Sequence, residues 1–418
     1  MSIFDYRQLA EVLFSDIYQL SFDGVGVSRA SFGLGESAAG EYLSRFAKNE
    51  GLIVHTDRAA NIIFSQTYVG ENTPAIWVGS HIDSVPQGGN FDGLAGVIAG
   101  LIILVASQRE NRKLSVPMKV VALRGEESAW FGRAYMGSSA IFGRLTPEDL
   151  ERKQRVTGET LGRSLEKLGA DVTAIRNQQV LVEKKNILGW LELHIEQGPV
   201  LVEKALPLAV VSGIRGNIRY NHIHCIGDAQ HSGAVPRELR HDAVYGVSDL
   251  IMRLDVRWKS RLSAGEDLVV TTGIFQTDSE EHAVSRIPGH VSFSLEARSL
   301  NTDILKAFSE DIFTEVQAVS QARGVKFIFD SPVFTAPATL DDTVLAAIKR
   351  SCHSLSVKHL ELASGAGHDS ANFANQGIPT GMLFVRNQNG SHNPHEAMNM
   401  DDFIQGIRVI KQTIENWV

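Results

Sequence analysis

Histidines and carboxylates lie at the ends of several apolar segments of this sequence, and both kinds of side chain bind divalent metal ions. His81 and Asp83 close one such segment, and alternation along an extended chain puts them on the same face. A carboxylate placed there can fix the imidazole tautomer that a metal ion needs, although the pair alone also fits a histidine beside a surface turn. A glycine-rich loop follows and ends at Asp92. This residue is either the N-cap of the next helix or a carboxylate that bridges two cations.

A second apolar segment ends at Glu126 and Glu127, a third contains His194, and a fourth leads to His392. Adjacent carboxylates ionise together only where a cation or hydrogen-bond donors offset their repulsion, and the alternative is a pair of solvated loop acids. Together, three histidines, one aspartate and one of the two glutamates make a set of five ligands. Such a set suits two adjacent divalent ions, and the other glutamate is then free to act as a base.

Other catalytic chemistries fit the sequence less well. Ser364, His368 and Asp369 lie within six residues, whereas a catalytic triad draws its members from different elements, and no G-x-S-x-G motif is present. The glycine-rich stretches lack the Lys-Ser/Thr pair of a phosphate loop and the spacing of a dinucleotide fingerprint. Cys225 alternates with histidines in a strand-like segment without a second cysteine motif, so we expect it to be a core residue.

The apolar segments themselves predict the fold class. They have the character of strands, they alternate with helical segments such as 94–106, and the pattern indicates an α/β fold in which helices flank a mixed sheet. Open α/β sheets bind ligands outside the carboxyl ends of their strands, which is where the candidate residues fall. The four strand-like segments are 75–83, 118–127, 189–197 and 381–392.

The order of elements changes between residues 214 and 330. Strands are expected at 218–226, 268–275, 290–297 and 325–329, and helices at 237–254 and 303–322. This βαββαβ order predicts a ferredoxin-like α+β unit inserted into the catalytic domain. We therefore expect a metal-binding catalytic domain formed by residues 1–213 and 331–418, with a lid and dimerisation domain at 214–330.

Length and composition narrow the function classes. A chain of 418 residues exceeds the ~250–300 at which a single core stops growing, so two units are expected. The formal charge of −8 disfavours nucleic acid as a partner. The N-terminal segment is amphipathic and the longest apolar run is too short to cross a bilayer, so neither export nor membrane insertion is indicated. Two cysteines, Cys225 and Cys352, fit a reducing compartment, and we expect a cytoplasmic protein.

Seven motifs occur in an order that resembles one enzyme family over nearly the whole chain. The motifs are GSHIDSVPQGGNFDG (79–93), RGEES (124–128), HIEQGP (194–199), GDAQHSGAVP (227–236), IPGHVSFSLEARS (287–299), SGAGHDSANFA (364–374) and GSHNPHE (390–396). The family is the hydantoinase/carbamoylase branch of the M20 metallopeptidase-like amidohydrolases. It comprises N-carbamoyl-L-amino acid hydrolases, allantoate amidohydrolases and bacterial-type β-ureidopropionases, and HIEQGP and SGAGHD are specific for this branch.

The resemblance implies two divalent metal ions per subunit. His81, Asp92 and His194 would hold one ion, and Asp92, Glu127 and His392 would hold the other. We expect zinc, with manganese, cobalt or nickel as alternatives, because imidazole and carboxylate ligands suit all four.

The resemblance also assigns roles around the metal ions. Glu126 matches the general acid/base and Asp83 the carboxylate behind the first metal-binding histidine. In the inserted domain, His231 matches the residue that polarises the scissile carbonyl, and Arg298 matches the clamp for the substrate carboxylate. The histidine at position 231 often serves the site of the partner subunit in such proteins, so a homodimer is implied.

Two further positions, Gln197 and Gly367, match substrate contacts of the family, and some positions depart from its pattern. Ser285 stands where an asparagine is usual before the I-P-G stretch, so we count it among the substrate-binding candidates. Trp130 occupies a place that is usually arginine, and Arg237 follows the proline where methionine is usual. The catalytic set is intact, and these departures bear on the substrate rather than on the reaction.

We therefore expect hydrolysis of a linear amide or ureido bond, with an N-carbamoyl amino acid or a related ureido acid as the substrate. In this hypothesis a hydroxide that bridges the metals attacks the carbonyl, and Glu126 accepts the water proton and returns it to the leaving nitrogen. The alternative is hydrolysis of an N-acyl amino acid or a dipeptide by the same apparatus. A metal-free binding protein on this fold would have lost at least one ligand or Glu126, and none is lost.

Overall fold

A computed structural model describes residues 3–281 and 283–417 of the chain. The chain divides into two compact units. The first is formed by Met1–Ser212 and Thr339–Val418, and the second by Gly213–Ala338. Within the described part of the chain, no helix has both the length and the apolar character needed to cross a membrane.

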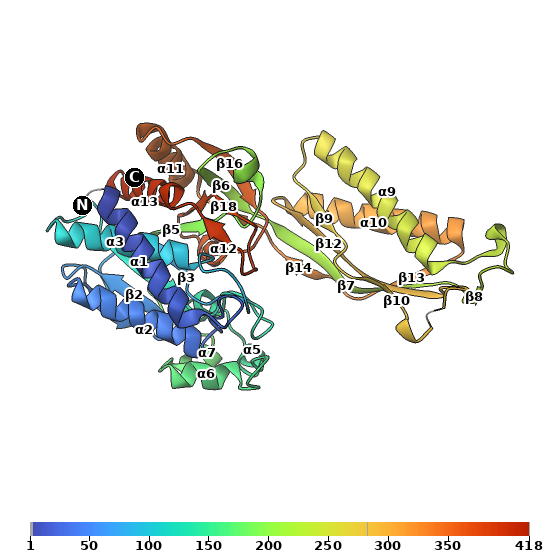
Figure 1. Cartoon of the computed structure of the whole chain (residues 1–418), viewed down its shortest axis with the longest axis horizontal. Helices are drawn as coiled ribbons and strands as arrows, with labels where there is room; N and C mark the ends of the chain where they lie inside the picture. Colours follow the sequence, from blue (N-terminus) through green and yellow to red (C-terminus); the bar gives the residue numbers. More distant parts are fainter. Residues whose placement is uncertain (1–2, 282, 418) are drawn as a thin grey trace. The chain divides into compact units, whose positions relative to one another are not determined.

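The first unit is built on a mixed sheet with the strand order β1-β2-β4-β3-β5-β17-β6-β15, and β16 pairs with β6 (Figure 1). Strands β4, β3, β5 and β17 run parallel, whereas β2 and β6 are antiparallel to their neighbours in that group. The strands are β1 (Ile53–Thr56), β2 (Ile62–Ser65), β3 (Ala75–His81), β4 (Met118–Leu123), β5 (Ile187–Ile195), β6 (Leu208–Ile214), β15 (Ala338–Thr339), β16 (His359–Ser364) and β17 (Thr380–Val385). The expected α/β class is confirmed, and the four predicted strands are β3, β4, β5 and β17.

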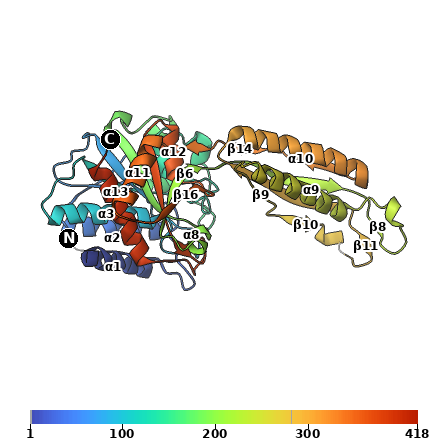
Figure 2. The same ribbon diagram turned by 90° about the horizontal axis from the view of Figure 1, so that it is seen from above.

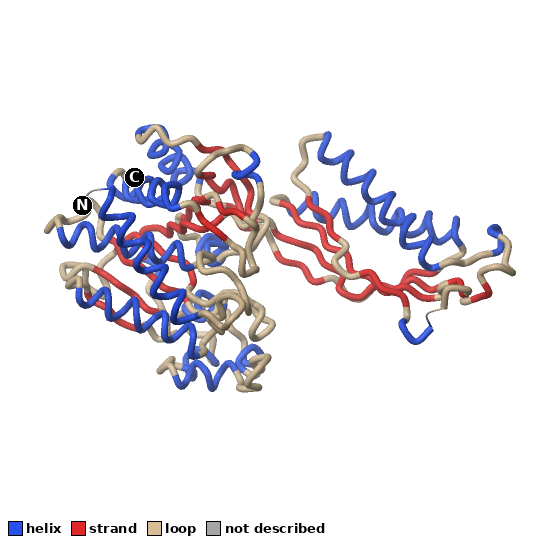
Figure 3. The backbone as a smooth tube through the Cα atoms, in the orientation of Figure 1, coloured by secondary structure: helices blue, strands red, loops and turns tan. Residues whose placement is uncertain are grey.

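Helices cover both faces of this sheet, as Figures 2 and 3 show. One face carries α2, α3, α11 and α13, with α1 packed on α2, α3 and α13. The other face carries α4 and α12, where Trp190 stacks on Phe373 with ring centroids 3.9 Å apart. The helices are α1 (Ile3–Ser21), α2 (Leu34–Asn49), α3 (Leu94–Arg109), α4 (Met136–Ile141), α5 (Pro147–Leu150), α6 (Leu161–Lys167), α7 (Val172–Arg176), α8 (Val200–Glu203), α11 (Asp342–Ser354), α12 (Asp369–Asn375) and α13 (Met400–Glu415).

Helix α3 follows the glycine-rich loop and is buried on every side from Leu94 to Ser107. An apolar helix without a polar face is stable only inside a protein core, and α3 lies between the sheet and its neighbours α1 and α13. The predicted buried helix is therefore confirmed. The helix begins at Leu94, two residues after Asp92, so it fixes the place where that carboxylate enters the site.

The second unit is an antiparallel sheet in the order β10-β12-β7-β13, with β9 pairing with β12 and β14 with β7. This order is that of a ferredoxin-like sheet, and its core is formed by α9 and α10 packed on the strands. A short ladder of β8 and β11 completes the unit. The elements are β7 (Gly216–Ile226), β8 (Gln230–His231), α9 (Ala243–Ser263), β9 (Val269–Thr271), β10 (Phe275–Thr277), β11 (Arg286–Ile287), β12 (His290–Ser299), α10 (Thr302–Arg323), β13 (Lys326–Phe329) and β14 (Val333–Thr335).

Three details of this unit differ from the sequence-based expectation. The unit extends past residue 330 to Ala338, because β14 pairs with β7. The helix expected at 237–254 begins at Ala243, because the side chain of Asp242 caps it by accepting hydrogen bonds from two backbone amides. The single strand expected at 268–275 is two short strands, β9 and β10, which pair with different parts of β12.

Candidate metal centre and active site

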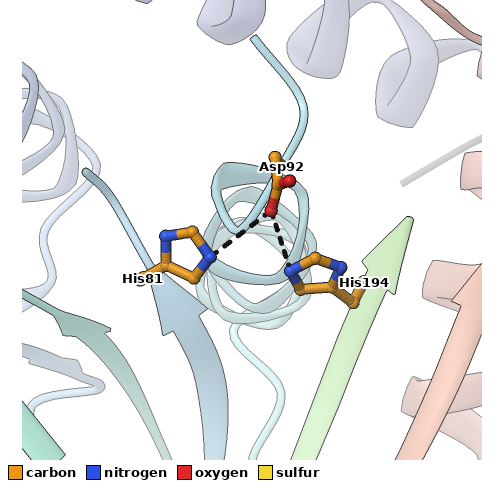
Figure 4. A group of neighbouring side chains, drawn as sticks. All are labelled: His81, Asp92 and His194. Carbon is orange, nitrogen blue, oxygen red and sulfur yellow. Dashed lines mark ion pairs between the residues drawn. The ribbon is translucent and has the colours of Figure 1, made fainter. Parts of the chain in front are cut away.

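Two neighbouring parallel strands and one helix bring the first group of ligands together. His81 is the last residue of β3, and His194 is the last but one of β5. Asp92 lies two residues before α3, and Figure 4 shows its carboxylate between the two imidazole rings above the helix end. The expected convergence of side chains at the carboxyl ends of the strands is therefore present.

The carboxylate of Asp92 is the centre of this arrangement. Its Oδ1 lies 3.1 Å from Nε2 of His194 and 3.4 Å from Nε2 of His81. The same oxygen is buried and forms no hydrogen bond within the described structure. The group thus offers two imidazole nitrogens and one carboxylate oxygen in a buried place. This donor set suits a divalent transition-metal ion.

The second oxygen of the same carboxylate faces a second group. Nε2 of His392 lies 3.4 Å from Oδ2 of Asp92 and 3.5 Å from Oε1 of Glu127. The three ligand atoms are close enough together to hold one ion. Because Asp92 belongs to both groups, the residues fit a pair of adjacent divalent ions with one shared carboxylate.

The loop that carries His392 lies between two short paired strands, β18 (Asn387–Gln388) and β19 (Ala397–Met398). His392 has a positive φ of 60°, a backbone conformation that costs energy for a residue other than glycine. Its side chain is about half exposed, with a relative area of 52%, whereas the other ligand side chains are buried. This histidine is therefore the solvent-facing member of the candidate ligand set.

Electrostatics within the metal-free centre follow from burial and from the crowding of charges. Burial raises the pKa of Glu127 to about 7, and the nearby charge of Asp92 adds to the rise. For Asp92, burial alone would raise the pKa, but the facing histidines lower it well below its usual range. Carboxylates that lie this close together remain charged when a divalent cation binds them, which agrees with a metal centre.

Glu126 lies beside the metal ligands. Its Oε2 is 3.8 Å from Nε2 of His81, and burial raises its pKa well above the usual range. A buried carboxylate that favours its protonated form can hold and return a proton, as a general acid/base must.

Asp83 connects His81 to the loop of the two glutamates. Its Oδ1 lies 3.3 Å from Nδ1 of His81 and accepts a hydrogen bond of 3.0 Å from the amide of Glu126. Its Oδ2 accepts one of 3.0 Å from the amide of Glu127 and one of 2.6 Å from the hydroxyl of Ser31. The structure thus places Asp83 behind the imidazole, where it fixes both the ring and the glutamates.

Several residues around Asp92 did not stand out in the sequence. The carboxylate of Glu396 accepts hydrogen bonds from the amides of Phe91 and Asp92 at 2.8 and 3.2 Å. The hydroxyl oxygen of Ser391 lies 2.6 Å from Oδ2 of Asp92 and 2.7 Å from Oε2 of Glu396, so its single proton can be donated to either carboxylate. Both residues belong to the motif at 390–396, and the one available signal was their place beside His392.

The predicted substrate-binding residues lie in both units. In the first unit, the side-chain amide of Gln197 donates to Oδ2 of Asp92 at 2.7 Å, so this residue contacts the metal centre itself. Gly367 lies against Tyr135, since a Cβ atom at this position would be 1.7 Å from the tyrosine hydroxyl oxygen. Trp130 is buried, and its indole NH donates to the carbonyl of Ser84 at 2.6 Å, so it supports the loop after β3.

The other three candidates lie in the second unit, and the structure brings only two of them together. His231 pairs with Arg286 in the β8 and β11 ladder, and Ser285 accepts a backbone hydrogen bond of 2.8 Å from Ser232. Arg298 lies near the other end of β12, where it donates to Glu296 at 3.0 Å. His231 and Ser285 are therefore neighbours, whereas Arg298 lies near the other end of β12 within this unit.

Comparisons with known proteins show the family of this chain. Residues 77–416 match the family described as Peptidase family M20/M25/M40. The chain is 32% identical to an N-carbamoyl-L-amino acid amidohydrolase of Geobacillus stearothermophilus, over 93% of each chain. It is 31% identical to an N-carbamoyl-L-amino-acid amidohydrolase of Pseudomonas sp. (strain NS671), over 93% of this chain and 92% of that one.

Among solved structures, a hydantoinase/carbamoylase family amidase from Burkholderia multivorans superposes with a TM-score of 0.87. It is 27% identical and the match covers 97% of each chain. The protein therefore belongs to the M20/M25/M40 family of metallopeptidase-like hydrolases, as the ordered motifs predicted.

Proposed function

We propose that this protein is a metal-dependent amidohydrolase that cleaves a linear C–N bond of an N-carbamoyl amino acid or a related ureido acid. The observation that carries the proposal is the shared carboxylate of Asp92 between two ligand groups, with the spare glutamate Glu126 beside them. The similarity to two carbamoyl amino acid amidohydrolases supports the choice of substrate class.

The roles of the residues follow from their positions. His81, Asp92 and His194 would hold one ion, and Asp92, Glu127 and His392 the other. Such ions supply Lewis-acid activation of the carbonyl and lower the pKa of a bound water, and zinc is our first choice for both.

The proton transfers fall to Glu126. Its carboxylate accepts the proton of the attacking water and donates it to the leaving nitrogen, while Asp83 keeps the His81 ring in the tautomer whose Nε2 faces the centre. For a carbamoyl substrate, the products are the free amino acid, ammonia and carbon dioxide.

Substrate recognition by the second unit requires more than one subunit in this proposal. Arg298 lies eight positions after His290 in β12, which corresponds to about 26 Å of extended chain. His231 and Ser285 lie beyond the His290 end. A small substrate cannot touch Arg298 and His231 of the same unit at once. We therefore propose that Arg298 of one subunit binds the substrate carboxylate and that His231 of the partner subunit polarises the scissile carbonyl.

The surface of α9 supports this homodimer. Tyr245, Met252 and Val256 recur at helical spacing on one side of the helix and are 62%, 62% and 64% exposed. A stripe of large apolar side chains is unusual on a free surface and suits a contact between two copies of the chain. Cys225 and Cys352 are buried free thiols, which agrees with the cytoplasm as the place of action.

A product-release assay tests the function. The metal-loaded protein would be incubated with N-carbamoyl amino acids, allantoate, 3-ureidopropionate, N-acetyl amino acids and dipeptides, and ammonia and free amino acid would be measured separately. We expect both products from ureido substrates and no turnover after chelation of the metal. Release of amino acid without ammonia, from N-acetyl compounds or dipeptides alone, would contradict the proposal in favour of acylase or peptidase activity.

A further inference from the structure

The backbone of the loop that carries the two glutamates is held by side chains from distant parts of the chain. Each amide group of residues 124–127 donates a hydrogen bond to a side-chain oxygen. The bonds are Arg124 to Asn61 (3.0 Å), Gly125 to Glu36 (2.9 Å), Glu126 to Asp83 (3.0 Å) and Glu127 to Asp83 (3.0 Å). The loop therefore has no regular partner strand and depends on these acceptors for its shape.

The carbonyl groups of the same loop are bound by the start of α4. Tyr135, Met136 and Gly137 donate their amides to the carbonyls of residues 126, 125 and 124, at distances of 2.8, 2.8 and 2.9 Å. These groups are backbone atoms, so their donor capacity does not depend on side-chain identity. A substitution can remove only the side-chain acceptors that bind the amides of the loop.

Among these acceptors, the family resemblance assigns Asp83 but neither Asn61 nor Glu36. Glu36 lies in the first turn of α2 and is completely buried. Its Oε1 accepts from the amide of Gly125 at 2.9 Å, and its Oε2 accepts from the amide of Phe32 and from the guanidinium of Arg124, both at 2.8 Å. One carboxylate thus joins the residue before Glu126 to the start of α2.

Arg124 strengthens the same connection. Its guanidinium is nearly buried, donates to the carbonyl of Ala60 at 2.8 Å and forms the ion pair with Glu36. A buried ion pair contributes little net stability but fixes geometry, and the loss of one partner leaves an uncompensated charge. The pair therefore specifies the position of the loop rather than the stability of the unit alone.

The conformation of Gly125 shows why this support is needed. Its φ is +65°, and a Cβ atom there would lie 2.3 Å from the ring of Phe32. The chain turns at this glycine and then presents Glu126 toward His81. A glycine has many accessible conformations, so the carboxylate that binds its amide selects the one that aims the next side chain.

We propose that Glu36, together with Arg124, is a positioning residue for the general acid/base Glu126. It acts on Gly125 as Asp83, in the loop after β3, acts on Glu126 and Glu127, but it does so from helix α2 and outside the candidate metal ligands. The catalytic part of this inference rests on the proposed function, because it assumes that Glu126 moves the protons.

The first test is the Glu36→Gln variant. The side-chain amide keeps the size of the residue, but its NH2 group replaces an acceptor where donors converge. With the best substrate of the release assay, we expect kcat to fall about 10- to 100-fold, as for a misplacement of the order of 1 Å. We expect KM to change by less than about twofold, and metal content to stay unchanged, because the amide of Glu127 keeps its hydrogen bond to Asp83 and no substrate contact is replaced.

A double variant and a matched control separate positioning from loss of stability. In Glu36→Gln/Arg124→Met the uncompensated charge is gone, so we expect the melting temperature to recover while kcat stays low. Asp402→Asn breaks another arginine and carboxylate pair of the first unit, in which Arg386 donates at 2.8 Å. We expect it to lower the melting temperature and to leave kcat per metal-loaded site unchanged. Recovery of kcat together with stability in the double variant would overturn the inference.

Hydrogen exchange gives a readout that does not depend on turnover. In metal-loaded protein, we expect the amides of the 124–137 segment to exchange faster in Glu36→Gln than in the parent protein or in Asp402→Asn. Unchanged exchange there would overturn the positioning role even if the enzyme is active. If the parent protein hydrolysed none of the substrates, the exchange result would still decide whether Glu36 holds the loop.

Discussion

At the scale of single residues, Asp92 differs from the other ligands because its two carboxylate oxygens face different groups. Oδ1 faces His81 and His194, whereas Oδ2 faces His392. A carboxylate shared in this way links the two sites energetically, since its removal takes a charged ligand from both. The bridging role makes a prediction about metal stoichiometry that no other ligand shares.

We expect Asp92→Ala to lose both ions and His392→Ala to lose mainly one, because only the aspartate belongs to both groups. Metal content per subunit after gel filtration measures the difference. His395→Ala is the control, since this exposed histidine of the same loop belongs to neither group. Two retained ions in Asp92→Ala would rule out the bridging assignment.

The two adjacent glutamates should have different functions, one in proton transfer and one in metal binding. We expect Glu126→Gln to retain both ions and to lose about 10²–10⁴-fold in kcat, because a general acid/base is removed while the two ligand groups that share Asp92 remain. Glu127→Gln should lower the affinity for the ion that His392 also binds. Metal titration and steady-state kinetics on both variants decide the matter, and the reverse pattern would mean that the two roles are exchanged.

Metal binding should depend on pH through His392. The hydrogen bond to Asp92 raises the pKa of this imidazole to about 9 in the metal-free protein, and the charge of Glu127 adds to the rise. An ion must displace that proton. We therefore expect the affinity for this ion to rise with pH until about pH 9, by at most about tenfold per unit from this group.

The same shift affects the metal-free fold with a defined sign. Because the folded-state pKa lies above the ordinary value, protonated His392 contributes stability that is fully present below about pH 6.5 and is lost as the pH rises through about 9. The predicted pH dependence of metal affinity can be measured by competition with a coloured chelator between about pH 7 and 9.5. If the affinity still rises with the same slope past about pH 9.5, or does not rise with pH below it, His392 is excluded as the titrating ligand.

Much of the site could be predicted from the sequence because its ligands end apolar strands. Histidines 81 and 194 and the pair at 126 and 127 follow buried segments, and the sheet brings such ends together. Glu36, Ser31 and Glu396 could not be found in this way. Each contacts a residue far away in the chain: the separation is 88 positions for Glu36, 52 for Ser31 and 304 for Glu396. No local pattern encodes such a pairing.

At the scale of elements, α3 decides how closely the site can assemble. The helix approaches the sheet through Gly96, where a Cβ atom would lie 2.4 Å from the carbonyl oxygen of Leu193 and 2.8 Å from Cβ of Ser80. These neighbours precede the ligands His194 and His81 in their strands. The small residue therefore sets the distance between the helix that follows Asp92 and the two strands that end in histidine.

We expect Gly96→Ala to destabilise the protein by about 1–3 kcal/mol, because backbone atoms of β5 cannot move aside without disturbing the sheet. Urea-induced unfolding of metal-free protein measures the change. Gly70→Ala is the control, since this exposed glycine meets only the hydroxyl of Thr73 at 3.3 Å. Equal stability of the two variants would contradict the packing argument.

Element boundaries were harder to predict than element types. The predicted βαββαβ order of the second unit is present, but α9 begins six residues later than the expected 237, where Asp242 can cap it. Strand β14 was missed because Val333, Phe334 and Thr335 are exposed and show no alternation of buried and exposed positions. Such a strand is defined by its backbone pairing with β7, which the sequence pattern does not reveal.

At the scale of the whole molecule, the distribution of the predicted substrate-binding residues matters more than any single contact. Strand β12 puts about 26 Å between His290 and Arg298, and His231 lies beyond the His290 end. The dimer that we propose, in which one subunit supplies Arg298 and the other His231 to a given site, would resolve this separation. The exposed apolar stripe of Tyr245, Met252 and Val256 on α9 is the surface on which we propose that the dimer forms.

A mixing experiment tests the exchange of His231 between subunits. His231→Ala and Glu126→Gln should each be nearly inactive alone. When the two variants are co-expressed with different tags, a mixed dimer contains one site with an intact Glu126 that receives an intact histidine from the other subunit.

Random assembly makes about half of the dimers mixed, with one working site in two, so we expect about a quarter of the parent activity. Purification through both tags in turn should raise the value to about half. No recovery in the doubly purified dimer would show that each His231 serves its own subunit, and it would remove the main argument for an obligatory dimer.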